Sequence, residues 1–97
     1  MERGGSVYIL TNKNNSTLYI GVTSNLLARI SEHRNKRNSG SFSSRYNLDK
    51  LVYYENFHQI EEAIMREKQL KGWIRAKKNK LVNSINPEWN DLFDNLI

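Results

Sequence analysis

The sequence predicts an α+β fold in which a small three-stranded antiparallel β-sheet, made of an N-terminal hairpin and a third strand, is flanked by helices. Three observations lead to this prediction. Two runs of β-branched and aromatic residues near the N-terminus are separated by a polar turn, a third such run begins at Lys50, and apolar residues with helical spacing follow the second and third runs. The 97 residues have the length of one domain, and we expect 1–97 to form a single unit.

The predicted hairpin consists of a strand at residues 7–10, the polar segment TNKNNST and a strand at residues 18–23. Side chains alternate between the two faces of a strand. A register that pairs Tyr8 with Tyr19 therefore places both tyrosines on one face of the sheet and the aliphatic residues on the other.

The segment after the hairpin has the pattern of an amphipathic helix. Ser24 or Asn25 can cap its start, and the pattern continues to about Lys36. Arg29 and His33 are four residues apart, so they are neighbours on the surface of this helix. The helix therefore presents an arginine and a histidine side by side.

The remaining elements follow a polar, glycine-containing loop, NKRNSGSFSS. Residues 50–57, KLVYYENF, are typical of a third strand. We expect a long helix over about 59–73, with Gly72 near its weakened end, and another helix over 75–85. Asn86 is followed by a proline and a glutamate, which favours the start of a last short helix there.

The composition excludes several classes of protein. There is no cysteine, which excludes a disulfide framework and thiolate metal sites. His33 and His58 are too few to build a zinc site from Cys and His ligands. The N-terminal segment has no apolar run long enough for a signal peptide or a membrane helix, so we expect a cytoplasmic protein without a membrane partner.

Positive charge is concentrated in one segment of the chain. The net charge is +5, and residues 66–80 alone carry seven basic side chains and a single acid, Glu67. The last ten residues, in contrast, carry three acids and no base. Such a basic block favours a polyanion such as nucleic acid as partner, and the alternative is a solvated helix face that keeps the protein soluble.

Glu67 has an unusual place on the long helix. At 100° per residue it falls close to the middle of a stripe that contains Ile60, Ile64, Lys71 and Ile74. A carboxylate directed at a core is costly unless it is paired or bound to a cation. Either Glu67 forms a salt bridge, for example with Arg29 or Arg45, or the stripe is shifted and leaves it at the rim, or it binds a metal. One carboxylate with waters and a substrate phosphate is a common way to hold Mg²⁺.

Together these residues resemble the GIY-YIG endonuclease family, and in particular its small standalone bacterial members. Ser6-Val7-Tyr8 stands where the family has its first tripeptide, and Tyr19-Ile20-Gly21 matches the second. Arg29 with His33 matches the family's arginine and its second polar residue one helical turn later. Glu67 matches the metal-binding glutamate. The resemblance extends from Ser6 to about Leu92 and implies a single GIY-YIG-like nuclease domain.

The chain departs from the family pattern at two places. Ser6 replaces the first glycine, and Val22 stands where some members have a lysine directly after the second glycine. A lysine of the basic block could supply the cation that Val22 lacks. Members often carry an asparagine beyond the glutamate, for which Asn79 and Asn83 are both candidates and Asn79 is the nearer in spacing.

The resemblance implies a metal-dependent endonuclease that hydrolyses phosphodiester bonds in DNA. One Mg²⁺ or Mn²⁺ on Glu67 would bind the phosphate and the leaving oxygen, and Arg29 would clamp the non-bridging oxygens. Tyr8 and Tyr19 compete for the role of general base, with Tyr8 slightly favoured. Because a phenol with a pKa near ~10 is a poor base at neutral pH, we expect the cation-rich site to lower the pKa of that tyrosine. His33 would hydrogen-bond a tyrosine hydroxyl or relay its proton.

The resemblance and the charge pattern also suggest the contacts with DNA. Gly21 has no side chain on the tyrosine face, so a phosphate backbone can come close to it. The other expected contacts are basic or amide side chains: Arg34, Lys36, Arg37, Arg45, Lys71, Arg75, Lys77, Lys78, Asn79 and Lys80. Phosphate contacts give affinity without sequence choice, so we expect low sequence specificity and a preference, if any, for distorted or branched DNA. DNA repair is a candidate process.

Two alternatives stay open at this point. A domain of the same fold could be a catalytically inactive nucleic-acid-binding module, and the missing lysine at Val22 is the best support for that. The basic helix could instead bind an acidic protein.

Overall fold

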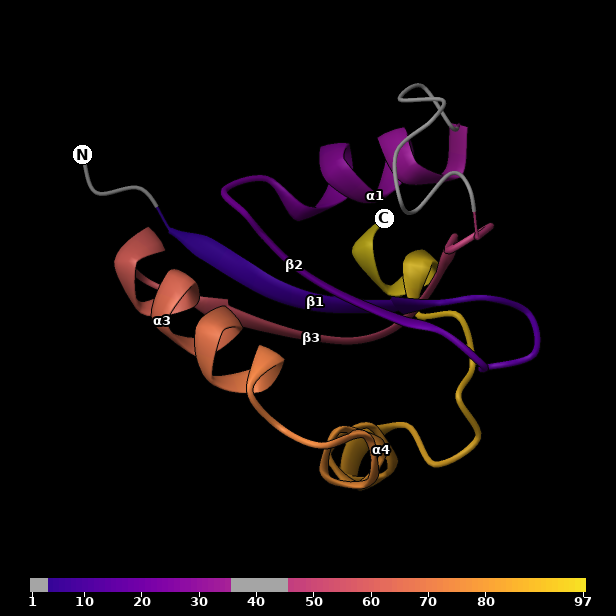
Figure 1. The fold of residues 1–97 in the computed structure, drawn as a ribbon. Coiled ribbons are helices and arrows are strands. Elements are labelled where there is room, and N and C mark those ends of the chain that lie inside the picture. The colour runs from indigo at the N-terminus through magenta and orange to yellow at the C-terminus, as the bar shows by residue number, and fades with distance from the viewer. Residues whose placement is uncertain (1–3, 36–45) are drawn as a thin grey trace.

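The elements of the fold are those of a small sheet with helices on both of its faces (Figure 1). The computed structural model describes residues 4–35 and 46–97. Along the chain lie β1 (Gly5–Thr11), β2 (Leu18–Thr23), α1 (Leu26–Asn35), β3 (Lys50–Phe57), α3 (Ile60–Lys71), α4 (Arg75–Ile85) and the 3₁₀ helix η1 (Phe93–Leu96). None of the helices in the described part of the chain is long and apolar enough to cross a membrane.

The three strands form one antiparallel sheet in the order β2-β1-β3. The predicted fold class is therefore confirmed, as are the existence of the hairpin and the bounds of the third strand. β1 lies in the centre and is buried along its whole length. β2 is an edge strand and is only partly buried. Side chains of β2 can therefore take part in a surface site while those of β1 cannot reach solvent.

The hairpin register differs from the predicted one by two residues. Tyr8 pairs with Gly21, and Tyr19 pairs with Leu10. The predicted pairing of the two tyrosines was wrong because β1 continues to Thr11, which pairs with Leu18, so the centre of the turn lies one residue later in the sequence than the predicted register requires. Its backbone is held by the Asn12 side chain, whose Oδ1 accepts the amide of Ser16 at 2.8 Å. A shift of two residues keeps each side chain on its face, so both tyrosines still share one face of the sheet.

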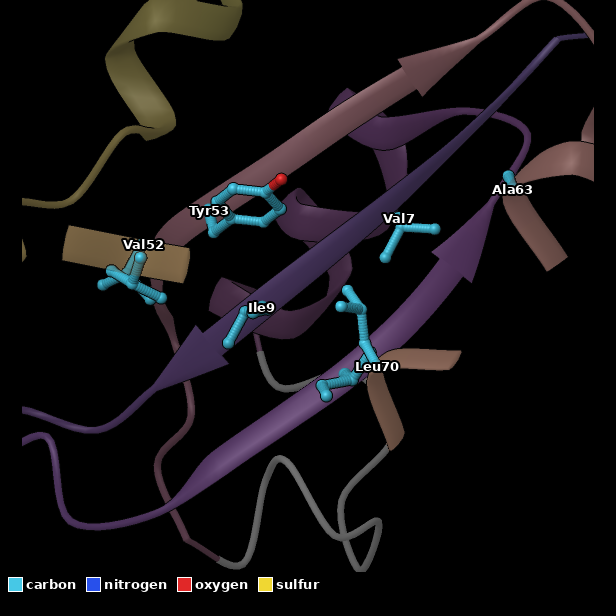
Figure 2. Close-up of a cluster of buried hydrophobic side chains, with 8 residues drawn as sticks. Val7, Ile9, Val52, Tyr53, Ala63 and Leu70 are labelled. Atoms are coloured by element: carbon cyan, nitrogen blue, oxygen red, sulfur yellow. The ribbon is translucent and has the colours of Figure 1, made fainter. Parts of the chain in front are cut away.

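Each face of the sheet has its own hydrophobic core. On one face, Val7 and Ile9 pack in one cluster with Ala63 and Leu70 of α3 and with Val82 of α4. Figure 2 labels the two strand residues and the two residues of α3. On the other face, Tyr8, Leu10, Ile30, Leu48 and Leu51 form a second core beneath α1 and η1. β1 contributes alternate residues to both cores and thereby joins them.

The pairing of β1 with β3 contains an irregularity at Val52. Ile9 pairs with Tyr53 and Leu10 with Leu51, so Val52 has no partner of its own. As a result, both Val52 and Tyr53 belong to the core on the α3 side (Figure 2). An extra residue of this kind bends the strand and leaves a backbone group without its ladder partner.

Asn86 explains why the chain does not form the helix predicted to start there. Its side-chain Nδ2 donates to the carbonyl of Val52 at 3.0 Å and to that of Asn90 at 2.8 Å, and its Oδ1 accepts the Asn90 amide at 3.1 Å. Trp89 then has a positive φ of 56°. The prediction was wrong because Asn86 closes a turn against β3 instead of capping a helix, and the only helical turn of this segment comes later, as η1.

Candidate functional site

Two tyrosines and a histidine meet on the α1 face of the sheet. The Tyr8 hydroxyl and His33 Nε2 share a hydrogen bond of 3.2 Å. The ring centroids are 5.9 Å apart for Tyr8 and His33, 5.7 Å for Tyr19 and His33, and 6.3 Å for the two tyrosines. Three of the residues that the sequence singled out thus form one cluster, with one member each from β1, β2 and α1.

Tyr8 is the buried member of this cluster. No part of it is exposed to solvent, and burial raises the pKa of its phenol to about 12. A hydrogen bond with Arg29 lowers that pKa in part, while the charges of Tyr19 and Glu67 raise it further. In the protein without a metal ion the pKa of this tyrosine is thus raised and not lowered, because loss of hydration outweighs the one neighbouring cation.

Arg29 connects the cluster to the protein surface. The hydrogen bond with Tyr8 is the main cause that raises the pKa of the Arg29 guanidinium. The side chain is also 41% exposed and lies 3.5 Å from Glu32, one helical turn away. An exposed ion pair of this kind is weak, so the guanidinium can exchange Glu32 for another anion while keeping its bond to Tyr8.

His33 lies between the two tyrosines as a neutral group. Burial is the main cause that lowers the pKa of its imidazole below the ordinary value of 6.5, and the charge of Arg29 lowers it further. A neutral imidazole has one ring nitrogen that donates and one that accepts. His33 can therefore take a proton from a neighbouring group at neutral pH.

Gly21 has a steric role that differs from the expected one. We expected the missing side chain to leave room for a phosphate, but the ring of Tyr8 fills that space. A Cβ atom at position 21 would overlap Cζ and the hydroxyl oxygen of Tyr8. Gly21 is thus needed for Tyr8 to lie across the strand and reach His33, and its contact with substrate stays a prediction.

Glu67 lies at the rim of the buried face of α3. The buried residues of that helix are Ala63 and Leu70, whereas Ile64 and Ile74 are exposed, so the predicted stripe was shifted from the true one. The Glu67 side chain is 15% exposed, and its Oε2 lies 3.0 Å from Nζ of Lys71. The salt bridge is therefore made with Lys71 and not with Arg29.

The charge of Glu67 nevertheless reaches the tyrosine cluster, because it is one of the causes that raise the pKa of Tyr8. Arg29 and His33 come from the helix on one face of the sheet, and Glu67 comes from the helix on the other. We therefore locate the site at the β2 edge, where the two faces meet.

The metal chemistry of Glu67 can be judged from its surroundings. Among residues 4–35 and 46–97 there is no group of three or more His, Cys, Asp or Glu side chains that could hold a metal ion. A divalent ion here would have one protein carboxylate, with water and a phosphate as its other ligands. The positively charged Lys71 ammonium already lies beside the Glu67 carboxylate, so a cation can be accommodated there. Glu67 therefore fits such an ion.

The predicted basic contacts differ in their surroundings. Lys71 and Lys78 line a groove of about 300 Å³ together with Leu18, Tyr19 and Ile20. Lys77 instead packs over the ring of Trp73, with Nζ 4.2 Å from its centroid. Lys36, Arg37 and Arg45 lie outside the described residues.

Three of the other predicted contacts already have partners within the protein. Arg34 forms an ion pair with Asp91 at 2.6 Å and lies over the Phe93 ring, so it joins α1 to the C-terminal segment. Asn79 accepts a hydrogen bond of 2.8 Å from Arg75, which also donates to carbonyls of the β1–β2 turn. Asn83, the other candidate asparagine, accepts the indole N–H of Trp89 at 2.6 Å. The choice between the two asparagines stays open.

Two interactions at the site were missed by the sequence analysis. The pairing of Glu67 with Lys71 has a clear signal, since an acid four residues before a lysine is a favourable helical pair. Asp91 binds Arg34 and accepts the amide of Leu51 at 3.2 Å. No local sequence pattern indicates this role, because the two partners are 57 and 40 residues away.

Comparison with known proteins identifies relatives over most of the chain. The family model of the GIY-YIG catalytic domain matches residues 4–81. A UPF0213 protein of Syntrophus aciditrophicus (strain SB) is 37% identical over 86 residues, which cover 84% of this chain and 92% of the relative. A UPF0213 protein of Clostridium perfringens is 41% identical over 78 residues, which cover 80% of this chain and 82% of the relative.

A solved structure also matches. The solution NMR structure of a UPF0213 protein from Bacillus halodurans superposes with a TM-score of 0.58 and 27% sequence identity. The match covers 91% of this chain and 92% of that one. The similarity thus includes the sheet and the helices that carry the candidate site.

Proposed function

This chain belongs to the GIY-YIG catalytic domain family, and from that membership we propose that it is a metal-dependent endonuclease that hydrolyses phosphodiester bonds in DNA. The proposal includes low sequence specificity, selection by DNA structure and a cytoplasmic location. DNA repair is the process we propose to examine first. Mg²⁺ or Mn²⁺ is the proposed ion.

One observation carries the proposal. Tyr8, Tyr19 and His33 form a single cluster, Arg29 is hydrogen-bonded to it, and the charge of Glu67 acts on its buried phenol. These side chains come from four different elements and span 60 residues of sequence. A core histidine with two packing tyrosines requires neither an adjacent exposed guanidinium nor a nearby carboxylate. The cluster has the cation, the proton acceptor and the metal ligand that phosphodiester hydrolysis needs.

The roles follow from burial and protonation. Arg29 would hold the non-bridging oxygens of the phosphate, because it is partly exposed and its planar donors suit that geometry. Tyr8, fully buried and with a pKa of about 12, is protonated at neutral pH and would hold His33 in position. The half-buried Tyr19 is then the better candidate to contact the attacking water, with neutral His33 beside it as proton acceptor. This replaces the slight preference for Tyr8 as the base.

A divalent ion held by Glu67 would supply positive charge for the phosphate and for the leaving oxygen. The proposed contacts with the rest of the DNA are Lys71, Lys77, Lys78 and Asn79 on α3 and α4 and Arg34 on α1. Lys36, Arg37 and Arg45, which lie outside the described residues, stay proposed contacts as well. Gly21 would act indirectly, through the position of Tyr8.

A second candidate function is a nucleic-acid-binding module without turnover. Val22, at the position of the missing lysine, packs against the core on the α3 side, so β2 adds no cation to the site there. The high pKa of Tyr8 also argues against that phenol as a base at neutral pH.

The test is a cleavage screen with single-stranded, nicked, flapped and junction DNA in the presence of Mg²⁺ or Mn²⁺. We expect nicked product from the wild-type protein and a loss of at least about 100-fold in rate for Arg29→Ala and for Glu67→Gln, because each removes a charge placed at the reacting phosphate. The matched control is Glu61→Gln, an exposed acid in the first turn of the same helix, which we expect to cleave like the wild type.

The outcomes separate the two candidates. DNA binding without product under either metal would favour the binding module. Full cleavage by both Arg29→Ala and Glu67→Gln would show that the assigned residues are wrong.

A further inference from the structure

Lys71 is placed between two environments. Its Nζ lies 3.0 Å from Oε2 of Glu67, one helical turn before it on α3. The two partners are unequally exposed, at 56% for the Lys71 side chain and 15% for that of Glu67. The carboxylate is thus held at the rim of the core, while the lysine stem extends over the surface and can turn elsewhere. An i,i+4 pair of this exposure contributes little stability, so the ammonium is not bound tightly to Glu67.

The second environment is the groove of about 300 Å³ at the edge of the sheet. Its described lining consists of Leu18, Tyr19 and Ile20 from β2, Lys71 from α3 and Lys78 from α4. Both charges in this lining are positive, and no carboxylate belongs to it. Leu18 and Ile20 offer an apolar wall beside the two ammonium groups. Such a lining suits an anionic group that is bonded to a less polar one, as the phosphate of a nucleotide is bonded to its sugar.

The groove is continuous with the candidate site through Tyr19, which belongs to the aromatic cluster and to the groove lining. It is also continuous through Lys71, which contacts the proposed metal ligand. A nucleic-acid strand whose reacting phosphate lies at Arg29 and Glu67 would therefore have a neighbouring phosphate near Lys71 and Lys78.

We propose that Lys71 and Lys78 form a phosphate subsite for the nucleic-acid strand next to the reacting phosphate, and that Lys71 is shared between this subsite and Glu67. The inference rests on the proposed function for the identity of the substrate. In the metal-free protein Lys71 neutralises Glu67. When a divalent cation takes the carboxylate, the Lys71 ammonium is displaced and binds the phosphate in the groove. The subsite provides the positive charge beside Tyr19 that Val22 does not.

A lysine shared in this way can be distinguished by experiment from a purely structural salt bridge and from a simple phosphate contact. A purely structural salt bridge predicts that loss of Lys71 leaves DNA affinity unchanged. A simple phosphate contact predicts that its loss leaves metal affinity unchanged. A shared lysine predicts two effects of opposite sign, because Lys71 competes with the metal and cooperates with the DNA.

The first measurement is Mn²⁺ binding without DNA, by calorimetry or by the electron paramagnetic resonance of free Mn²⁺. We expect Lys71→Met to bind Mn²⁺ about two- to fivefold more tightly than the wild type, which is the effect of removing a weak competing ion pair. Lys78→Met should bind it as the wild type does. Glu67→Gln should lose the binding, which identifies the site.

The second measurement is the affinity for a short DNA duplex as a function of salt, by fluorescence anisotropy in Ca²⁺ and in EDTA. For Lys71→Met and Lys78→Met in Ca²⁺ we expect the slope of log K against log salt to become shallower by about 0.9, the effect of one lost phosphate contact. In EDTA the change for Lys71→Met should be smaller, because Glu67 then retains the lysine. Lys68→Met, an exposed lysine of the same helix, is the matched control for loss of one charge and should change the slope less than either variant.

Each outcome decides the proposal. Tighter Mn²⁺ binding together with a shallower salt slope for Lys71→Met supports it. It is overturned by unchanged or weaker Mn²⁺ binding of that variant, by absence of Mn²⁺ binding to the wild type, or by a DNA salt slope no different from that of Lys68→Met. None of these measurements requires turnover. A wild-type protein that passes them but never cleaves DNA would contradict the endonuclease and leave the subsite intact.

Discussion

At the scale of single residues, the site is governed by the burial of Tyr8. Its phenol lies in a core with no exposed surface, between Gly21, which leaves space for the ring, and His33, with which it shares a hydrogen bond. Arg29 opposes the effect of burial on the pKa, and Glu67 adds to it. The balance keeps Tyr8 protonated at neutral pH, and in the proposed function it supports the two residues assigned to contact substrate, Tyr19 and Arg29.

The lowered pKa of His33 leads to a prediction about stability and pH. Because the pKa of His33 is lower in the folded protein than in the unfolded chain, the unfolded chain binds more protons as the pH falls. The free energy of unfolding should therefore decrease as the pH falls below about 6.5, the ordinary value of the imidazole, and level off below the pKa of folded His33. Imidazole NMR titration and urea unfolding between pH 8 and pH 5 measure both quantities.

The control uses the other histidine of the chain. His58 is exposed, so His58→Gln should keep the pH dependence, whereas His33→Gln should reduce it. A folded His33 that titrates at or above 6.5 would contradict the prediction.

At the scale of elements, the position of the site depends on β2 being an edge strand. α1 lies on one face of the sheet and α3 on the other (Figure 1). Residues from these two helices can meet only where the sheet ends, and α3 packs more extensively against the β2 edge than against the β3 edge. The two-residue difference in hairpin register moves Gly21 opposite Tyr8, and this pairing is what allows the Tyr8 ring to lie across β2.

Asn86 joins two elements and gives a prediction about stability. Its buried side chain satisfies the carbonyl of Val52, the residue without a strand partner, and closes the turn to Asn90. Asn86→Ala would leave that carbonyl without its partner, so we expect a loss of about 1–3 kcal/mol in the free energy of unfolding. Urea denaturation measures it.

Asn90→Ala is the matched control, because exposed Asn90 contributes only backbone groups to this turn. We expect that variant to stay within about 0.5 kcal/mol of the wild type. Equal losses for the two variants would mean that the Asn86 hydrogen bonds do not stabilise the turn.

At the scale of the whole molecule, two small cores share one central strand. β1 gives Val7 and Ile9 to the α3 side and Tyr8 and Leu10 to the α1 side. Neither core can lose its β1 residues without removing the support of the other. The candidate site, which takes residues from both sides, therefore depends on both cores.

The shared strand predicts that the described part of the protein unfolds in one step. Both tryptophans, Trp73 and Trp89, pack on the α3 side, so tryptophan fluorescence reports on that core alone. Far-UV circular dichroism reports on the elements of both sides. We expect the two methods to give the same midpoint in urea, because a two-state transition shows coincident probes. A fluorescence midpoint clearly below that from circular dichroism would mean that the two cores unfold separately.

Much of the fold and of the candidate site follows from the sequence. The three strands, the helix that carries Arg29 and His33, and the two helices after β3 are each specified by local patterns of apolar, capping and turn residues. The grouping of Tyr8, Tyr19, Arg29, His33 and Glu67 came from their spacing and the family resemblance. Local alternation was enough to put both tyrosines on one face, since a register error of two residues leaves the face unchanged.

Only the tertiary structure decided the protonation and pairing within the site. Whether burial or a cation controls the pKa of Tyr8 depends on how many atoms exclude water from it, and the core that surrounds it takes residues from all three strands and from α1. The partner of Glu67, the space beside Gly21 and the turn at Asn86 likewise depend on which distant groups are brought into contact. The sequence by itself determined which groups the site contains, because residue types and local periodicity are written in it. The structure determined their charges and contacts, because desolvation and packing are properties of the folded chain.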